Sequence, residues 1–334
     1  MSQRVVGQLS LADAFVQRRT GLTERLEGFS SLLDWQAVDQ VLRPLRPAER
    51  GAPGYPPLVL FRALLLAQWY GLSDERLEDE LADRSSFRRF VGLSLADATP
   101  DHSTLWRFRE ALGREGLAEV AFGEVGRQFE ERGLVLKKGT LIDATLVAAQ
   151  AAKPKVPKAE ASAAVPEGER PASKLVASTV DPDAGWTRRG GARLFGYKAH
   201  IGVDQASGLI RGQILTPAQV NETRVADQLI QGDEAAVYAD KAYDSKARRK
   251  LLKKLKIKNR IQRRANKHHR LSARQEHRNK LIGHVRGRVE TVFGFFKRVW
   301  HYRHVRYFNL RRNAAQLALM CMAYNLSRAL RLIR

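Results

Sequence analysis

The chain has 334 residues, of which 44% are hydrophobic and five are Trp, so it can fold into two domains with a packed core. This composition excludes an intrinsically disordered protein. The formal net charge of +23 is typical of a protein that binds a polyanion, and nucleic acid is the commonest such partner. A ribosomal or other RNA-binding protein would carry the same charge, so composition alone does not separate RNA from DNA.

The sequence shows no sign of membrane insertion or export. Polar residues interrupt the longest apolar runs, 58–69 and 317–326, so neither run could span a bilayer. The first residues lack the apolar core of a secretory signal. The single cysteine, Cys321, cannot form an internal disulfide. We therefore expect a cytoplasmic protein with no membrane partner.

The positive charge is concentrated in one part of the chain. Residues 241–334 contain 28 Lys and Arg but only three acids, Asp244, Glu276 and Glu290, whereas residues 1–240 contain 30 basic and 32 acidic residues. We therefore expect the last 94 residues to face the polyanion. An acid such as Glu290, kept among so many cations, needs a chemical reason, and metal-dependent phosphodiester chemistry supplies one.

Helical patterns dominate the N-terminal part of the chain. We expect a helical arm over 1–52 and a helical domain over 53–130. Ser73, followed by acids in the first turn, is placed to cap one helix. A second helix is expected to begin near 99–103 and to present one apolar face until Gly113.

These two helices, joined by a loop over 92–100, are typical of a helix-turn-helix-like unit. The first helix carries several acids, which would repel phosphates. Any contact of the unit with DNA would therefore come from Arg107 and Arg109 on the second helix. A dimerisation or packing role explains the same pattern equally well.

From residue 131 on, the pattern changes to that of an α/β protein with a mixed sheet. Residues 134–148 alternate in the manner of a strand, and residues 150–178, rich in Ala, Pro, Lys and Glu, predict a flexible insertion. The other expected elements are strands over 197–203, 209–215, 235–239 and 258–263, a helix capped by Asn221, and helices over 245–255, 272–300 and 310–332. We assign them to one domain, 131–334.

Three acids stand where the ends of strands and a helix could bring them together. Asp143 lies inside an apolar strand, Asp240 follows the strand at 235–239, and Glu290 lies on the long helix. An ionised carboxylate in apolar surroundings is costly unless it is paired or bound to a metal. Phosphodiester hydrolysis can use two Mg²⁺ ions, hard cations that prefer carboxylate oxygens. The three acids are therefore candidate metal ligands.

Arg286 and Lys297 flank Glu290 on one face of the long helix, within roughly 40° of each other. The adjacent apolar stripe is expected to consist of Leu281, Val285, Val289, Val292 and Phe296. This arrangement would set Glu290 between two cations at the edge of the core. An ordinary Arg–Glu pair on a solvated face, worth a few tenths of a kcal/mol, is the alternative interpretation.

Other polar and aromatic residues have simpler interpretations. The acids among them are expected to form a helix cap at Asp244 and turns at Asp181, Asp183 and Asp204. His268 and His269 have no cysteine partners, which argues against a zinc site. The aromatic residues Trp300, Tyr302 and Tyr307 alternate with arginines and could either stack on unpaired bases or pack against the last helix.

Several motifs, in their order and spacing, resemble the DDE transposases of bacterial insertion sequences. The motifs are Asp143 in its strand, Asp240-Lys-Ala-Tyr-Asp, Arg286-x3-Glu290-x6-Lys297, the run from Asp181 to Gly191, Gly196-Tyr-Lys-Ala-His and Thr216-Pro-Ala. They are most similar to the insertion-sequence-five-like group, in the branch with a Tyr-x2-Arg-x3-Glu-x6-Lys motif. Gly283 stands where that motif has its Tyr. The stretch 53–111 also resembles this group's helical leader domain, so the resemblance covers roughly residues 50–334.

The resemblance implies a ribonuclease-H-like catalytic domain with a mixed sheet. In such a domain Asp143, Asp240 and Glu290 would hold two Mg²⁺ ions, for which Mn²⁺ could substitute. Arg286 and Lys297 would contact phosphates beside the cleaved bond. The further candidates for DNA contact are Lys241, Arg288, Arg298, Arg107 and Arg109.

The function implied is that of a transposase. It would bind the inverted-repeat ends of its own element as double-stranded DNA, cleave them to expose 3′-hydroxyls, and join these to target DNA. Pairing two ends requires a homodimer or a higher assembly, located at the bacterial nucleoid. A non-catalytic DNA-binding regulator and a structure-selective nuclease on the same fold are the alternatives, and the retained acids favour an enzyme over the regulator.

Overall fold

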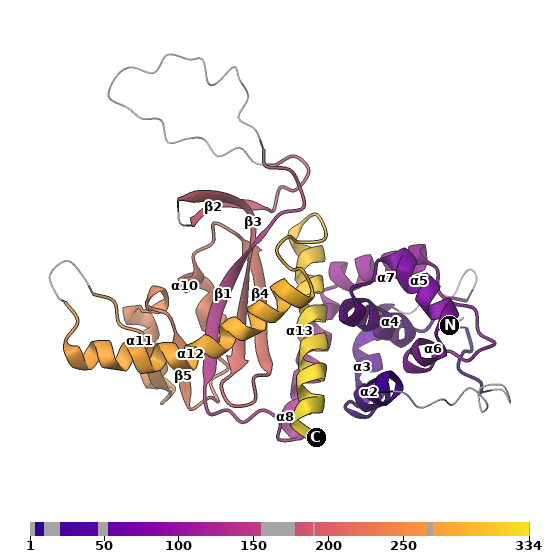
Figure 1. Ribbon diagram of the computed structural model, residues 1–334, viewed down its shortest axis with the longest axis horizontal. Coiled ribbons are helices and arrows are strands. Elements are labelled where there is room, and N and C mark those ends of the chain that lie inside the picture. The colour runs from indigo at the N-terminus through magenta and orange to yellow at the C-terminus, as the bar shows by residue number, and fades with distance from the viewer. Residues whose placement is uncertain are drawn as a thin grey trace, which may run out of the picture.

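The computed structural model describes residues 4–9, 21–45, 53–154, 178–189, 191–265 and 270–333. They form a group of N-terminal helices, a six-stranded sheet and two long helices (Figure 1). The N-terminal helices are α2 (Gly21–Ser31), α3 (Trp35–Leu42), η1 (Arg43–Leu45), α4 (Pro57–Tyr70), α5 (Asp74–Asp83), α6 (Ser85–Val91), α7 (His102–Arg114) and α8 (Leu117–Glu131). An all-α part followed by an α/β part was expected, and this is confirmed.

Local sequence sets where these helices begin. Ser73 caps α5 by accepting a hydrogen bond from the backbone N–H of Arg76 at 3.1 Å, as expected. Asp101 caps α7 in the same way. Between them lies α6, which was not predicted and which ends at the left-handed Gly92 (φ 91°). The unit that was expected to hold two helices therefore holds three.

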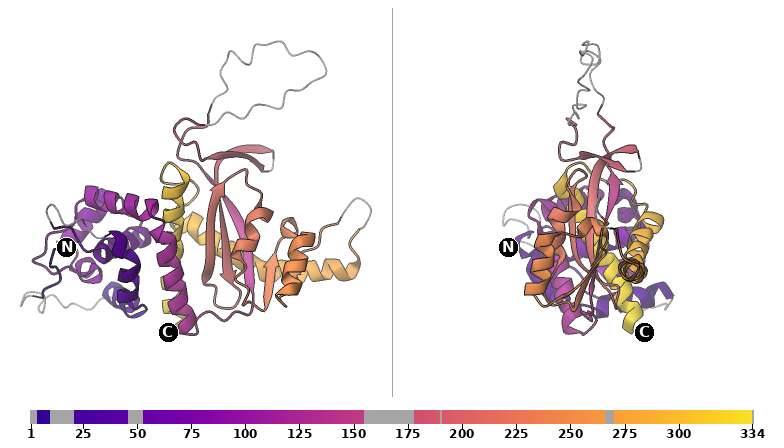
Figure 2. Two further views of the ribbon diagram at one scale, coloured as in Figure 1. Left: turned by 180° about the vertical axis from the view of Figure 1, so that it is seen from behind. Right: turned by 90° about the vertical axis from the view of Figure 1, so that its left-hand side faces the viewer.

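The last helix, α13 (Leu310–Ile333), packs against both parts of the molecule. It contacts α4, α7 and α8 on one side and β4 on the other (Figures 1 and 2). Trp69 of α4 donates its indole N–H to the carbonyl of Ala323 at 2.8 Å. The Asn325 side chain bonds both backbone groups of Ile210 in β4, at 2.8 and 2.7 Å. One helix thus carries much of the core that the two parts share.

The sheet has the strand order β2-β3-β1-β5-β6, with β4 also paired to β3. Strand β3 is antiparallel to its neighbours β1, β2 and β4, and β5 and β6 run parallel to β1. The strands are β1 (Thr140–Ala148), β2 (Gly185–Arg189), β3 (Ala192–Asp204), β4 (Ile210–Pro217), β5 (Ala236–Ala239) and β6 (Lys258–Ile261). This is the ribonuclease-H-like arrangement, and it confirms the expected fold class; β2 and the first part of β3 were not predicted.

Helices cover both faces of the sheet. The helix α12 (Ala273–Val299) crosses one face over β1 and β5 (Figure 1). The other face is covered by α10 (Glu222–Val225), η2 (Ala226–Leu229) and α11 (Lys246–Lys254). Successive residues of a strand point to opposite faces, so Leu141 joins the core beneath α12 whereas Ile142 packs with Leu229 and Leu252. Asp143 therefore faces α12.

The buried stripe of α12 differs from the expected one at its beginning. Ile282, Val289, Val292 and Phe296 are buried, whereas Leu281 is 59% exposed. The reason is helical geometry, because Ile282 lies only about 20° around the helix from Val289 and Leu281 lies about 80° away. The start of α12 was predicted correctly, with a capping box formed by Ser272 and Gln275.

Some expectations fall on parts of the chain outside the described residues. These parts are most of the expected insertion, 155–177, stretches of the expected N-terminal arm, and His268 with His269. Within the described residues, no helix is long and apolar enough to cross a membrane.

Asp181 and Asp183 fix the start of α13. Asp181 is buried and accepts hydrogen bonds from the Tyr197 hydroxyl at 2.5 Å and from the backbone N–H of Asn309 at 3.0 Å. Asp183, in a turn as expected, accepts from the N–H of Leu310 at 2.8 Å. Negative side chains at a helix N-terminus also interact favourably with the helix dipole. The segment before β2 is thereby bonded to the last helix.

We predict that Asp181→Ala lowers the free energy of unfolding by about 2–4 kcal/mol, because it leaves the buried Tyr197 hydroxyl and the partly buried N–H of Asn309 without their acceptor. Asp183→Ala, at an exposed position, should cost about 1 kcal/mol or less. Urea denaturation of the two variants measures the difference. Equal effects would contradict this account of how α13 is anchored.

Candidate active site

Asp143 and Asp240 belong to neighbouring parallel strands, Asp143 within β1 and Asp240 directly after β5. Thr140 pairs with Val237 and Leu141 with Tyr238, and continuing this register would align Asp143 with Asp240. Asp240 follows β5 directly. It caps the short η3 (Lys241–Tyr243), because its side chain accepts a hydrogen bond from the backbone N–H of Lys241 at 2.6 Å. Asp240 thus stands at the carboxyl end of β5, where ligands collect in sheets of this kind, whereas Asp143 lies within β1.

Arg286 connects Asp143 to Glu290. One Nη atom of Arg286 lies 3.2 Å from Oδ2 of Asp143, and the other lies 2.8 Å from Oε1 of Glu290. The side chains of Arg286 and Asp143 are 19% and 18% exposed, and that of Glu290 is 60% exposed. The simple Arg–Glu surface pair considered above therefore describes only half of the interaction, because the same guanidinium also binds a half-buried acid of the sheet.

Burial shifts the pKa of Asp143 upwards. Desolvation, as the largest cause, and the nearby charges of Glu222 and Glu290 together raise the pKa of this carboxyl to about 6, although Arg286 and the N–H of Ala144 act in the opposite direction. The contact with the Arg286 guanidinium therefore does not fully compensate for the burial of the Asp143 carboxylate. A site of this kind favours a further cation.

Glu222 is an acid at this site that sequence reasoning missed. It raises the pKa of Asp143 and, together with burial and Asp143, that of Tyr243. Its Oε1 lies 3.4 Å from Nζ of Lys198, which also donates to the carbonyl of Val220 at 3.0 Å. Its place directly after the Asn221 cap was the available signal. An acid in a first helical turn is so common that the position alone did not suggest a site.

The cations expected around Glu290 separate into two groups. Lys297 lies on the same side of α12 as Arg286, and its ammonium donates to Oγ1 of Thr145, two residues beyond Asp143 on β1. Arg288 and Arg298 are exposed on other sides of α12 and donate to the carbonyls of Gln205 and Gly294. Lys241, also exposed, follows Asp240 directly. Arg286 and Lys297 thus face the acids, and the other three face solvent.

The helical domain requires a correction. Arg109, expected to contact DNA, is 6% exposed, and its guanidinium binds both carboxylate oxygens of Asp74 at 2.5 and 2.6 Å. Its apolar surroundings and this bidentate pair turn it inward, so it does not offer a phosphate contact. Arg107 is exposed and bonds the backbone and hydroxyl of Ser103 in its own helix.

A second correction concerns Asp244. Ser245, not Asp244, caps α11, by accepting from the N–H of Arg248 at 3.1 Å. Asp244 instead pairs with Arg249, whose guanidinium donates to it from Nε at 2.7 Å. Asp204 behaves as expected, since it accepts the N–H groups of Ala206 and Ser207 in the hairpin turn.

As they stand, no three His, Cys, Asp or Glu side chains among the described residues lie close enough together to hold a metal ion. The expected convergence of Asp143, Asp240 and Glu290 is therefore incomplete, and Arg286 supplies the positive charge between two of them. The donors nevertheless fit a hard divalent cation, because all three are carboxylates. The position of the guanidinium also shows that a cation is accommodated between Asp143 and Glu290.

Comparison with known proteins gives two family matches. Residues 136–326 match the family described as "Transposase DDE domain", which is more than half of the chain, and residues 13–111 match "Transposase domain (DUF772)". A structure titled "Crystal structure of a pre-cleavage Mos1 transpososome" is similar over 85% of this chain and 81% of that chain, at 12% identity and a TM-score of 0.20. So distant a likeness bears on neither fold nor function.

The raised pKa of Asp143 predicts a pH dependence of stability. The folded chain holds this proton more tightly than the unfolded chain, so Asp143 costs stability as pH rises from its ordinary pKa of 3.8 through about 6. The unfolding free energy of the wild type, relative to Asp143→Asn, should fall by about 2 kcal/mol between pH 4.5 and 7. Urea denaturation at several pH values checks this, and a pH-independent difference would contradict it.

The two arginines of α7 give a matched pair of variants. Arg109→Gln should lower the free energy of unfolding by about 3 kcal/mol, because Asp74 is left without its partner in a largely buried pair. Arg107→Gln should change it by less than about 0.5 kcal/mol. Thermal and urea denaturation measure both. If Arg109→Gln kept full stability and instead weakened DNA binding, the ion pair would not be its role.

Proposed function

The chain belongs to the transposase DDE-domain family, and on that basis we propose that it is the DNA transposase of an insertion sequence. Its motifs favour the insertion-sequence-five-like group and the Tyr-Arg-Glu-Lys branch, with Gly283 in place of the Tyr. Residues 131–334 would form the catalytic domain, and residues 53–130 would bind DNA or dimerise. The observation that carries the proposal is Arg286, which bonds both the Asp of β1 and the Glu of α12.

The three acids are the ligands that this chemistry needs. Asp143, Asp240 and Glu290 would hold the divalent cations, which we propose to be two Mg²⁺ ions, or Mn²⁺ in their place. When bound, these ions activate the attacking oxygen and stabilise the leaving oxygen. Strand β1 holds Asp143 and the end of the neighbouring strand β5 holds Asp240, and the exposed Glu290 on α12 has the freedom to complete the set.

Arg286 and Lys297 would bind the phosphate at the reacting bond. Both extend from α12 towards β1, on the side where Asp143 lies. The Nε of Arg286 is buried and has no acceptor among the described residues, so this guanidinium retains a donor for a further oxygen. Once the acids hold cations, the guanidinium is repelled from them and its attraction to a phosphate increases.

One site can serve both steps of transposition. Releasing a 3′-hydroxyl by hydrolysis and joining that hydroxyl to target DNA are both in-line displacements at phosphorus. The exposed cations Lys241, Arg288 and Arg298 would bind the DNA backbone around the acids. With 28 Lys and Arg in the last 94 residues, affinity should fall steeply with salt. Two element ends must be held at once, so we propose a homodimer or a larger assembly.

The test replaces each acid by its amide. Asp143→Asn, Asp240→Asn and Glu290→Gln should each abolish cleavage of a duplex that carries an end of the element. Binding of that duplex should persist, because the basic surface is unchanged. Strand cleavage on a gel and fluorescence anisotropy measure the two properties separately.

Glu276→Gln is the matched control. Glu276 is an exposed acid in the first turn of the same helix, α12, so its amide variant should cleave like the wild type. Cleavage that survives in any of the three acid variants would remove that residue from the site. Loss of binding together with intact chemistry would contradict the assignment as a whole.

A further inference from the structure

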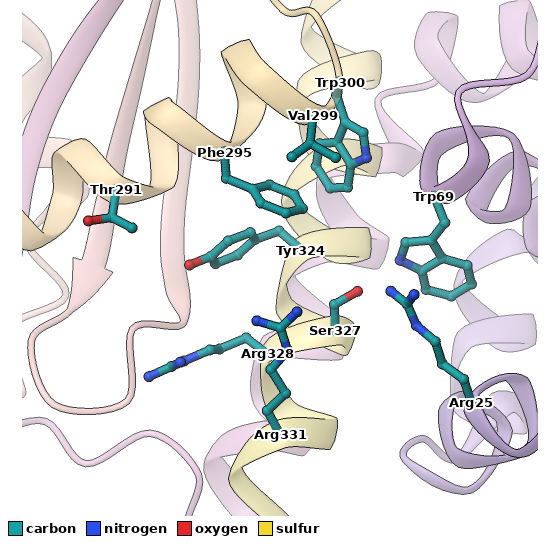
Figure 3. A pocket seen from close by; sticks show the side chains of 10 residues that line it. All are labelled: Arg25, Trp69, Thr291, Phe295, Val299, Trp300, Tyr324, Ser327, Arg328 and Arg331. Atoms are coloured by element: carbon teal, nitrogen blue, oxygen red, sulfur yellow. The ribbon is translucent and has the colours of Figure 1, made fainter. Parts of the chain in front are cut away.

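A cavity of about 350 Å³ lies where the N-terminal helices meet α12 and α13 (Figure 3). Its lining comes from four elements that are far apart in the sequence: α2, α4, α12 with the residue that follows it, and α13. The volume is within the range of small-molecule sites. The proposed catalytic residues do not line it, so it needs a separate explanation.

One part of the lining is aromatic. The ring of Phe295 packs edge-on against those of Trp300 and Tyr324, with distances between the ring centroids of 4.9 and 5.6 Å. Trp69 stands across the cavity from them (Figure 3), and its position is fixed by the bond to Ala323 and by stacking on Phe29 at 4.2 Å. These rings are only partly buried. Aromatic surface therefore remains open to a flat ligand.

The other part of the lining is positive. Arg25, Arg328 and Arg331 line the cavity, and no Asp or Glu is among its lining residues in the described part of the chain. Figure 3 shows the guanidinium group of Arg25 beside Trp69 and that of Arg331 directed towards Tyr324. Arg328 is held at one side by the carbonyl of Ser207, which its Nε donates to at 2.7 Å. A ligand that suits this lining is flat at one end and anionic at the other.

The cavity is on the side of α12 away from Glu290, although its lining residues lie close to Glu290 along this helix. Thr291, Phe295 and Val299 line it, and they lie about 100–180° around the helix from Glu290. A second hollow of about 250 Å³ shares Thr291 and Tyr324 and extends to Arg288. Arg288 and Arg328 line this second hollow together with Asp204, which accepts hydrogen bonds within its own turn. The helix between the cavity and the acids is only about 10 Å thick.

We propose that this cavity binds one unpaired nucleotide of the DNA substrate, a site separate from the acids. The base would stack among Trp69, Phe295 and Tyr324, and its phosphate would bind Arg25 and Arg331. A duplex is too wide for a hollow of about 350 Å³, whereas a base turned out of its stack presents both a flat face and a charge. The proposal rests on the proposed function in one respect, namely that the partner is DNA.

The test uses the full chain with the Asp143→Asn change, so that bound DNA stays uncut. Duplexes of the element end carry 2-aminopurine at one position at a time, near the cleavage point on either strand. One position should change its fluorescence on binding. That change should disappear in the double variant Arg25→Gln/Arg331→Gln and in Phe295→Leu, and the Kd for the duplex should rise roughly tenfold.

Arg311→Gln is the control, since Arg311 is exposed on α13 and does not line the cavity; it should behave like the wild type. Phe295→Leu keeps an apolar side chain, and unchanged circular dichroism would show that each variant is folded. The proposal is overturned if no 2-aminopurine position depends on the cavity residues. It is also overturned if thymidine 5′-monophosphate alone binds there, by calorimetry, and no DNA position does. Either result leaves the amide-variant test of the catalytic acids unaffected.

Discussion

The Arg286 guanidinium determines how the catalytic half of the molecule is put together. The packing of α12 over β1 brings Glu290 and Asp143 within reach of the same guanidinium. Two carboxylates that are this near to one side chain repel each other in a half-buried site. Arg286 offsets that repulsion by bonding both. The buried side of α12, from Ile282 to Phe296, can then rest on the sheet while its charged side stays over the acids. A chain that placed these acids together without a cation would favour a different orientation of the helix.

A second constraint is that the two parts of the chain share α13. Its buried residues serve the N-terminal helices and the sheet at once, through contacts such as Trp69 with Ala323 and Asn325 with Ile210. The cavity beside α13 is a consequence of this sharing, because side chains from both parts line it. The helical part is thereby held against α13, and it shares the cavity with the helix that carries Glu290.

Much of this fold could be predicted from the sequence, for identifiable reasons. Apolar periodicity, the Ser73 and Ser272 caps and the hairpin turn at Asp204 are local signals, and the elements they indicate are present. The strand β2 was missed because Gly185–Arg189 carries little apolar alternation and exists through its pairing with β3. The ion pair of Arg109 with Asp74 was missed for a related reason, since 35 residues separate the partners and no local pattern shows which cation turns inward.

The candidate site likewise has some features that the sequence could indicate and others that it could not. The three acids were proposed from their positions within a strand, after a strand and on the long helix. Sequence cannot show that Arg286 reaches across to Asp143, because 143 residues separate the two. Glu222 was missed because nothing local distinguishes it from an ordinary acid in a first helical turn. Burial, which shifts the pKa of Asp143, is likewise a property of the folded chain alone.

The most direct test of the central claim is a structure of the protein bound to an end of its element in Mn²⁺, with the metal located by its anomalous scattering. The account predicts manganese coordinated by Asp143, Asp240 and Glu290, with Arg286 moved from the two carboxylates to a phosphate of the DNA. DNA bound with no metal at these acids, and Arg286 still bridging Asp143 and Glu290, would contradict it.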